Sequence, residues 1–240
     1  MPAFQIRNQT SEIRNTYSDK CTKSRCFADH NPVTEQTDHH KKSLRAELRA
    51  MLRCVPPEQL HSASAAACAL LDETTEFERA ACVMIFWPLA YEMDARPLAM
   101  RAWQRGKTVA LPLVSYEQRH MIAVEIRSLG DSMRTDQHGV NSPTNAPPIP
   151  ARMIDLVIVP GLGFDLTGHR LGRGGGFYDR FLSRRNFRGL TCGLAMEQQV
   201  VEHIPTQPHD VRLDMLATER RILRFGEEEG ARGQGLGKRD

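Results

Sequence analysis

The chain has 240 residues, of which 40% are hydrophobic and 25% are charged, and its formal net charge is +3. This composition is typical of a soluble globular protein that can bury a sizeable core. No stripe of Lys and Arg interleaved with aromatic residues indicates nucleic-acid binding, and no apolar run is long enough for a membrane span, so a small anionic ligand fits better.

Both ends of the chain are polar and poor in large aliphatic residues. Residues 1–38 have no apolar core of a secretion signal and are too acidic for a transit peptide, so they are expected to form a disordered extension. Residues 226–240 are rich in Gly and Glu, which predicts a flexible tail. One α/β domain is therefore expected at residues 39–225. The six cysteines contain no C-x-x-C pair, which is typical of reduced thiols in a cytoplasmic protein.

Along the chain, apolar stripes at helical spacing alternate with short apolar runs typical of strands. Helices are expected at residues 44–52, 60–71 and 95–106, after Gly176, and at 197–203. Strands are expected at residues 82–87, 108–114, 121–126, 154–159 and 191–195. This alternation predicts an α/β fold with a mostly parallel open sheet and helices on both faces, in three α/β/α layers. Residues 128–152 hold four prolines and two glycines, which predicts a long loop that could close over a site.

The most informative segment connects the strand at residues 154–159 to the following helix. Seven glycines lie at residues 161–176, together with Arg170 and Arg173. Glycines let the backbone approach a ligand closely, so that amide N–H groups can converge on an anion at the start of a helix. The forked donors of arginine suit phosphate oxygens, and Asp179 in the first helical turn suits a Mg²⁺ ion shared with them. The segment therefore predicts a phosphate site.

Other interpretations of this loop are weaker. Glycine loops in α/β domains often only turn the chain, and Asp179 could simply complement the helix dipole. No Gly-Lys-Ser/Thr follows, so the loop is not a Walker A motif, and Phe177 stands where a dinucleotide-binding fingerprint would have its third glycine.

Residues 160–182 resemble the signature of the 5-formyltetrahydrofolate cyclo-ligase family, which is also called 5,10-methenyltetrahydrofolate synthetase. That signature runs as Pro-Gly-x-x-Phe-Asp, then Gly-x-Arg-Leu-Gly, then Gly-x-Gly-Tyr-Tyr-Asp-Arg. The likeness covers about residues 41–225, and Phe177 departs from it because the family commonly has tyrosine there. Weaker matches lie at residues 41–45, 85–92, 105–112 and 209–210.

The resemblance implies a catalytic domain that uses ATP and Mg²⁺ on a small-molecule folate substrate, with neither nucleic acid nor membrane as a partner, and a monomer is expected. The implied catalytic residues are Arg170, Arg173 and Tyr178. The implied ATP-binding residues are Lys41, Arg45, Arg170, Leu171, Gly172, Arg173, Gly174, Gly175, Gly176, Phe177 and Tyr178. The implied folate-binding residues are Trp87, Glu92, Arg173 and Phe177. The implied Mg²⁺ ligands are Asp179 and Asp210.

Several of these residues would carry little weight without the resemblance. Lys41, Arg45 and Arg49 recur every four residues on one helical stripe, which is usually a solvated face, and the resemblance adds nothing for Arg49. Trp87 and Glu92 follow the first strand at the sheet edge where ligands bind in α/β folds, although packing and solvation are the ordinary reasons for such residues.

The implied reaction is the ATP-dependent cyclisation of 5-formyltetrahydrofolate to 5,10-methenyltetrahydrofolate with release of ADP and phosphate. Two alternatives stay open from the residues alone. A nucleotide-dependent oxidoreductase would use a similar loop, but residues 191–195 offer no acidic group for a ribose. A non-catalytic regulator that binds folate or phosphate would keep the loop without turnover.

Overall fold

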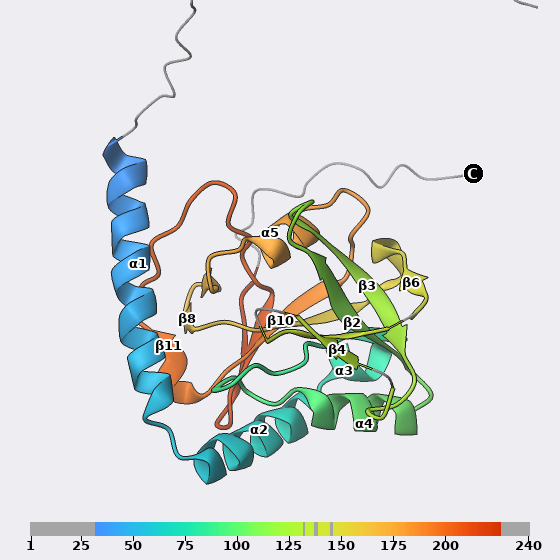
Figure 1. The fold of residues 1–240 in the computed structure, drawn as a ribbon. Helices are drawn as coiled ribbons and strands as arrows, with labels where there is room; N and C mark the ends of the chain where they lie inside the picture. Colours follow the sequence, from blue (N-terminus) through green and yellow to red (C-terminus); the bar gives the residue numbers. More distant parts are fainter. Residues whose placement is uncertain (1–31, 132, 137–138, 145, 227–240) are drawn as a thin grey trace, which may run out of the picture. The chain divides into compact units, whose positions relative to one another are not determined.

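An eight-stranded sheet forms the centre of the computed structural model, which describes residues 32–131, 133–136, 139–144 and 146–226 (Figure 1). Its strand order is β13-β12-β10-β7-β1-β2-β3-β6. The inner strands β12, β10, β7, β1 and β2 run parallel, whereas β13, β3 and β6 pair antiparallel. The bounds are β1 Cys82–Met84, β2 Thr108–Ser115, β3 His120–Ile126, β6 Pro148–Ile149, β7 Leu156–Val159, β10 Leu190–Leu194, β12 Met215–Ala217 and β13 Ile222–Arg224.

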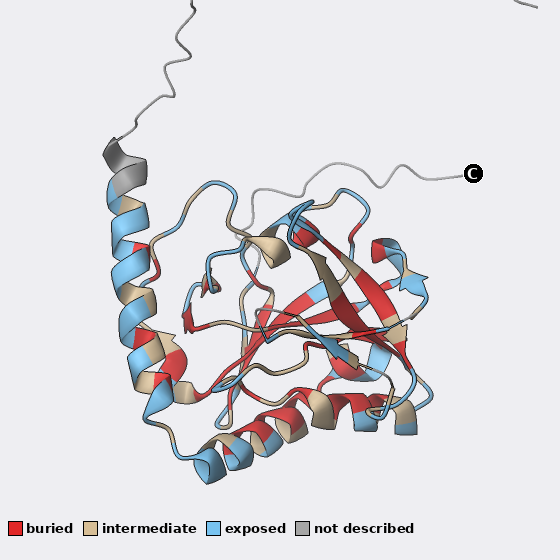
Figure 2. Cartoon of the chain, in the orientation of Figure 1, coloured by how far each residue is buried: buried red, intermediate tan, exposed pale blue. Residues whose placement is uncertain are grey.

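Helices cover both faces of this sheet, as predicted. In β7, Leu156 and Ile158 pack with residues of α1, α2 and α4, whereas Val157 and Val159 pack on the other face with residues of α5. Figure 2 shows the buried residues on the helix surfaces that face the sheet. A strand that is apolar on both faces is typical of a sheet covered on both sides. The bounds are α1 Pro32–Arg53, α2 Pro57–Asp72, α3 Thr75–Arg79, α4 Arg96–Gln104 and α5 Phe177–Leu182.

A small second sheet carries the chain from β7 to the glycine loop. It has the order β11-β8-β9, with β8 at Gly163–Asp165, β9 at Arg170–Leu171 and β11 at Val200–Val201. Helix α1 packs closely on β8, because a Cβ at Gly163 would lie only 2.6 Å from Cδ1 of Leu48. This contact brings the basic side of α1 to the glycine loop.

Three expected elements differ in the structure. Residues 197–203 do not form a helix: a 3₁₀ turn at Glu197–Gln199 leads into β11, whose β-branched pair of valines joins β8. The loop at residues 128–152 contains a hairpin of β4 (Met133–Thr135) and β5 (Asn141–Pro143), as well as β6 and a 3₁₀ turn at Ala151–Met153. The first strand ends at Met84 instead of residue 87.

Helix α1 begins at Pro32, within the segment that the sequence predicted as an extension, and the predicted domain bounds of 39–225 stay a prediction. The rest of the expected N-terminal extension and the tail from residue 227 lie outside the described residues, and so do Cys21 and Cys26. Within the described part, each helix is too short or too polar to cross a bilayer.

Candidate active site

A cavity of about 630 Å³ opens where β7 and β1 end and the glycine loop begins. All the residues that the sequence predicted for ATP, folate and Mg²⁺ line it, including Lys41 from α1 and Asp210 from the C-terminal part of the domain. Ligands of open α/β sheets bind at this carboxyl edge. The structure therefore brings the predicted residues together, while their individual roles remain predictions.

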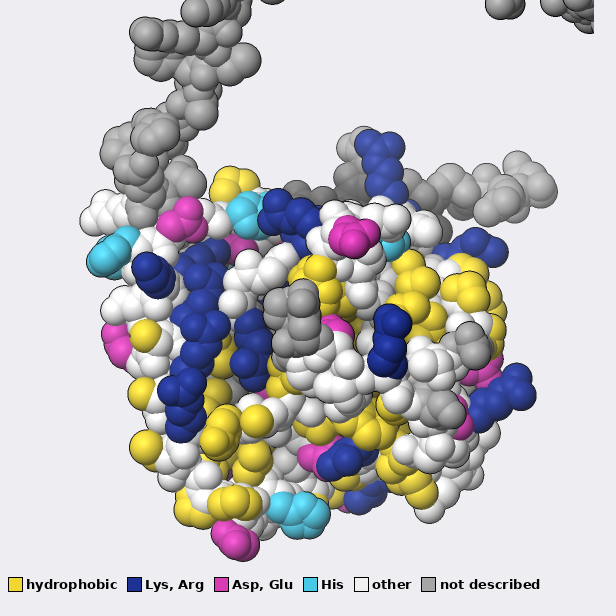
Figure 3. Space-filling view, in the orientation of Figure 1, with side chains coloured by type: hydrophobic (Ala, Val, Ile, Leu, Met, Phe, Trp, Pro, Cys, Tyr) yellow, Lys and Arg dark blue, Asp and Glu magenta, His cyan; other side chains and the backbone are white. Residues whose placement is uncertain are grey.

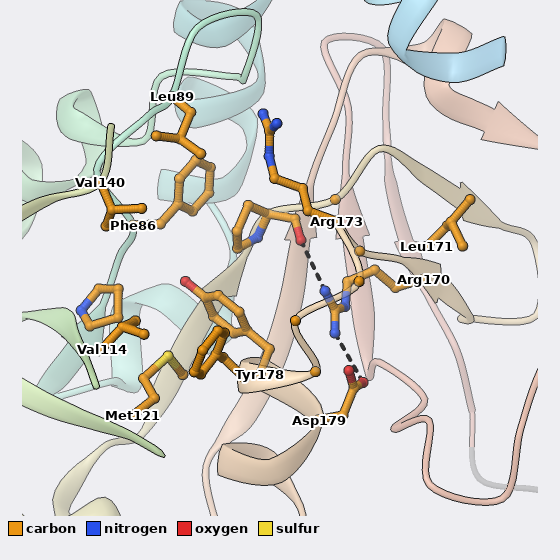
Figure 4. Close-up of a pocket in the computed structure, with 18 of the residues that line it drawn as sticks. Phe86, Leu89, Val114, Met121, Val140, Arg170, Leu171, Arg173, Tyr178 and Asp179 are labelled. Atoms are coloured by element: carbon orange, nitrogen blue, oxygen red, sulfur yellow. Dashed lines mark hydrogen bonds and ion pairs between the residues drawn. The ribbon is translucent and has the colours of Figure 1, made fainter. Parts of the chain in front are cut away.

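The cavity has an apolar wall and a charged wall. Figure 4 shows Phe86, Leu89, Val114, Met121 and Val140 on one side, and Arg170, Arg173 and Asp179 on the other. Such a division suits a ligand that has an aromatic body and an anionic end.

The glycine loop is held in place from α1. Arg45 Nε donates to the carbonyl of Gly172 at 3.0 Å, and Arg49 Nη2 donates to the carbonyl of Arg173 at 3.3 Å. With these carbonyls bound to α1, the amides of the next three glycines donate no hydrogen bond to any described residue. Gly174 and Gly176 have φ values of +108° and +64°, which residues with a Cβ rarely adopt. The sequence pattern assigned no role to Arg49, whose contact depends on how α1 docks.

Cations line this side of the molecule. Figure 3 shows a stripe of Lys and Arg side chains along α1. Burial, and then the neighbouring charge of Arg49, lower the pKa of Arg45, yet arginine stays cationic at neutral pH. Lys41 is buried and forms an ion pair with Asp210, which also accepts the backbone N–H of Gln207 at 2.7 Å.

Arg170 lies at the base of the loop with its side chain only 5% exposed. Its Nη2 contacts Oδ1 of Asp179 at 3.0 Å and its Nη1 donates to the carbonyl of Pro160 at 3.3 Å (Figure 4). Its Nε is buried and has no hydrogen-bond partner in the described part of the chain. Buried donors without partners are costly, and they occur at sites that await a ligand.

Arg173 reaches across the cavity to Glu92, with 2.7 Å between Nε and Oε1. The other oxygen of Glu92 accepts the backbone N–H of Leu89 at 2.9 Å. The cavity thus contains three ion pairs, each of which joins a cation predicted to bind phosphate with a carboxylate predicted to bind Mg²⁺ or folate: Lys41–Asp210, Arg170–Asp179 and Arg173–Glu92.

These residues fit a nucleotide with its metal ion. Free loop amides and several cations can hold phosphate oxygens, and Asp179 and Asp210 open onto the same cavity. Within the described residues, no cluster of three or more His, Cys, Asp or Glu side chains is arranged to hold a metal ion. Two carboxylates with phosphate oxygens suit Mg²⁺, whereas a closed protein cage is typical of other ions.

Tyr178 is half-buried as a residue, but its hydroxyl oxygen is buried and has no hydrogen-bond partner among the described residues. Burial, and then the charge of Glu92, raise the pKa of Tyr178. The hydroxyl therefore stays protonated and can donate to a ligand in the cavity. The guanidinium of Arg170 lies over the ring, 5.6 Å from its centroid.

Aromatic residues at the apolar wall are already packed. The guanidinium of Arg96 lies 5.4 Å from the centroid of Trp87, and Phe177 meets Tyr116 edge to face at 5.3 Å. The sequence pattern did not single out Tyr116 or the apolar residues from β2 and β3, because they look like ordinary strand residues. Val140 belongs to the proline-rich segment that was expected near the site, and it does line the cavity.

Comparisons with known proteins agree with this arrangement. The family model described as the 5-formyltetrahydrofolate cyclo-ligase family matches residues 37–219. The 5-formyltetrahydrofolate cyclo-ligase of Mus musculus is 27% identical over 190 residues, which cover 75% of this chain and 93% of the relative. That of Haemophilus influenzae is 30% identical over 177 residues, which cover 72% and 94%.

A solved structure has the same fold. The NMR structure of 5,10-methenyltetrahydrofolate synthetase from Aquifex aeolicus aligns with a TM-score of 0.68 and 28% identity, and the alignment covers 82% of this chain and 97% of that one. With the signature loop, the cavity and these matches in agreement, the chain belongs to the 5-formyltetrahydrofolate cyclo-ligase family.

Proposed function

We propose that the protein converts 5-formyltetrahydrofolate to 5,10-methenyltetrahydrofolate and couples this cyclisation to conversion of ATP to ADP and phosphate, with Mg²⁺. The observation that carries the proposal is one cavity in which free glycine-loop amides and arginines face an apolar wall. The amides and arginines suit a triphosphate, and the apolar wall suits the ring system of a folate. The relatives' names support the same reaction.

The residues divide between the two ligands. Arg170, Arg173 and the amides of Gly174 to Gly176 hold the phosphoryl group that is transferred, and Lys41 and Arg45 hold the other phosphates. Asp179 and Asp210 hold Mg²⁺, which when bound would neutralise charge on the phosphate oxygens.

On the folate side, Glu92 accepts hydrogen bonds from the amide and amino groups of the pterin, because a carboxylate is an acceptor only. Trp87 and Phe177 contribute apolar surface beside the ring. The hydroxyl of Tyr178 donates to the substrate, since it has no partner among the described residues.

The reaction needs positioning more than acid-base chemistry. The formyl oxygen attacks the γ-phosphorus and ADP leaves; N10 then attacks the activated formyl carbon, and phosphate departs with that oxygen while N10 loses its proton. The protein holds the two ligands in line and neutralises the phosphate charge, which supplies most of the catalysis in phosphoryl transfer.

The direct test mixes purified protein with Mg²⁺, ATP and 5-formyltetrahydrofolate and follows the near-ultraviolet absorption of the methenyl product. Product is expected only when all three are present. Arg173→Gln should lower the rate by about 100-fold, because one phosphate contact is lost in the transition state, while Arg53→Gln on the exposed end of α1 serves as the matched control. Binding of both ligands without product would favour the regulator instead, and oxidation or reduction of a nicotinamide would favour the oxidoreductase.

The proposal includes a monomer in the cytoplasm. Among the described cysteines, Cys68, Cys82 and Cys192 are buried free thiols, which suits a reducing compartment. Size-exclusion chromatography with light scattering and fractionation of cells test these two points.

A further inference from the structure

We propose that Arg173 couples the two ligands by exchanging partners: it neutralises Glu92 while the folate is absent and turns to the nucleotide phosphates once the folate has replaced it at Glu92. This inference rests on the proposed function. Its consequence is that each ligand binds more tightly when the other is present.

The two partners of this ion pair are held very differently. The side chain of Glu92 is only 8% exposed and its second oxygen is fixed by the N–H of Leu89, whereas the side chain of Arg173 is 42% exposed and comes from the glycine loop. The arginine is therefore the partner that can leave. Glu92 stays behind in a buried position.

Removing the arginine leaves a buried carboxylate without a counter-ion. Removing one member of a buried ion pair is strongly unfavourable, because the charge that remains has neither water nor a counter-ion beside it. The hydroxyl of Tyr178 does not replace the lost cation. A nucleotide that draws Arg173 to its phosphates therefore binds weakly until a ligand with N–H donors occupies Glu92.

The other two ion pairs at the cavity behave differently. When a metal-bound triphosphate enters, Lys41 and Arg170 gain phosphate oxygens while Asp210 and Asp179 gain the metal ion, so one ligand supplies both replacements. Only at Glu92 must the replacement come from the second ligand. Within the described residues that line the cavity, the Arg173–Glu92 pair is thus the one that links folate to nucleotide.

Titration calorimetry measures this coupling without turnover. A non-hydrolysable ATP analogue with Mg²⁺ is titrated into the full-length protein, alone and with a saturating reduced folate that lacks the formyl group. The Kd of the analogue should fall by about five- to 100-fold when the folate is present, and the Kd of the folate should fall by the same factor in the reverse experiment.

Two variants locate the effect. Glu92→Gln removes the buried charge, so the analogue should bind with the same Kd, within about twofold, whether the folate is present or absent. Arg173→Gln should bind the analogue more weakly and also without dependence on the folate. Glu197→Gln is the matched control, because Glu197 is a partly buried carboxylate paired with Arg221 and does not line the cavity; it should keep the wild-type coupling.

The outcomes separate the two proposals. If the wild type binds both ligands but neither affects the affinity for the other, the exchange is refuted and the proposed function stands. Full coupling in Glu92→Gln would refute the exchange as well. A folded protein that binds neither ligand would refute the proposed function, and the exchange with it.

Discussion

Asp165, at the end of β8, is fully buried, and both oxygens of its carboxylate accept hydrogen bonds from other parts of the protein. Its Oδ1 accepts the N–H of Thr167 at 2.9 Å, the hydroxyl of Thr167 at 2.7 Å and the N–H of His169 at 2.9 Å, while Oδ2 accepts the N–H of Ile204 at 3.1 Å. The side chain thus closes the turn from β8 to β9 and ties it to the C-terminal segment. We expect Asp165→Asn to destabilise the whole domain.

The magnitude follows from these contacts. An amide can still accept at one oxygen, but its NH₂ group would face the N–H of Ile204, donor against donor. A buried N–H without an acceptor costs about 1–3 kcal/mol, and hydrogen bonds to the remaining oxygen lose the strengthening that the negative charge gave them. Together these effects predict a loss of about 3 kcal/mol in the free energy of unfolding at pH 7.

The effect has a defined pH dependence. Burial alone would raise the pKa of Asp165, but hydrogen bonds from Thr167, His169 and Ile204 outweigh it, so the pKa lies below its ordinary value. Stability from this carboxylate is therefore present above the pKa of an unfolded aspartate, about 3.9, and is lost as the pH falls below it. The difference between wild type and Asp165→Asn should shrink over that range.

Urea unfolding followed by circular dichroism measures the difference. The control is Asp131→Asn, since Asp131 accepts hydrogen bonds from Arg127 and Ser128 in an exposed loop and should change stability by less than about 0.5 kcal/mol. If Asp165→Asn also lies within 0.5 kcal/mol of the wild type at pH 7, the hydrogen-bond reasoning is wrong.

Three further predictions concern the site and one exposed ion pair. Tyr178→Phe should leave the free energy of unfolding within about 0.5 kcal/mol of wild type, because the hydroxyl that it removes has no partner among the described residues, yet it should lower kcat about tenfold or more. An unchanged kcat would contradict a role in binding substrate. Arg49→Gln should raise the KM for ATP about threefold through the loop carbonyl that it binds, whereas Arg53→Gln should not. Hydrogen bonds from Arg224 lower the pKa of Glu76 from 4.5 to about 2. Glu76→Gln should therefore lower the free energy of unfolding by about 1 kcal/mol at pH 7. Denaturation curves should show this difference shrinking as the pH falls from 4.5 towards 2.

Much of the fold could be predicted because its main signals are local. The run at β7 is apolar at every position, which indicates a strand covered on both faces, and the glycines before α5 indicate a close backbone approach. The predicted helix at residues 197–203 was wrong because its two valines pair with β8, a partner far away in the sequence. Strands of two or three residues, such as β8 and β9, are too short for any periodicity to show.

The charged residues that line the cavity were predictable, and so were Trp87 and Phe177 on its apolar side, but the apolar residues from β2 and β3 were not. The signature loop marks Arg170 and Asp179 directly, and the family likeness reaches Lys41 and Asp210. By contrast, Val114 and Met121 lie on the strands β2 and β3, where an apolar residue is expected whether or not it faces a ligand. The pairing of Arg173 with Glu92 joins residues 81 positions apart, and no local pattern specifies which carboxylate an arginine will meet.

The ion pair between Lys41 and Asp210 joins positions 169 residues apart. During synthesis on the ribosome, α1 emerges long before the segment that holds its partner, so the buried lysine has no counter-ion until nearly the whole domain has left the exit tunnel. Under the proposed function, a nascent chain would have no complete phosphate site. ATP would then stabilise the finished protein against proteolysis but not its partly synthesised forms.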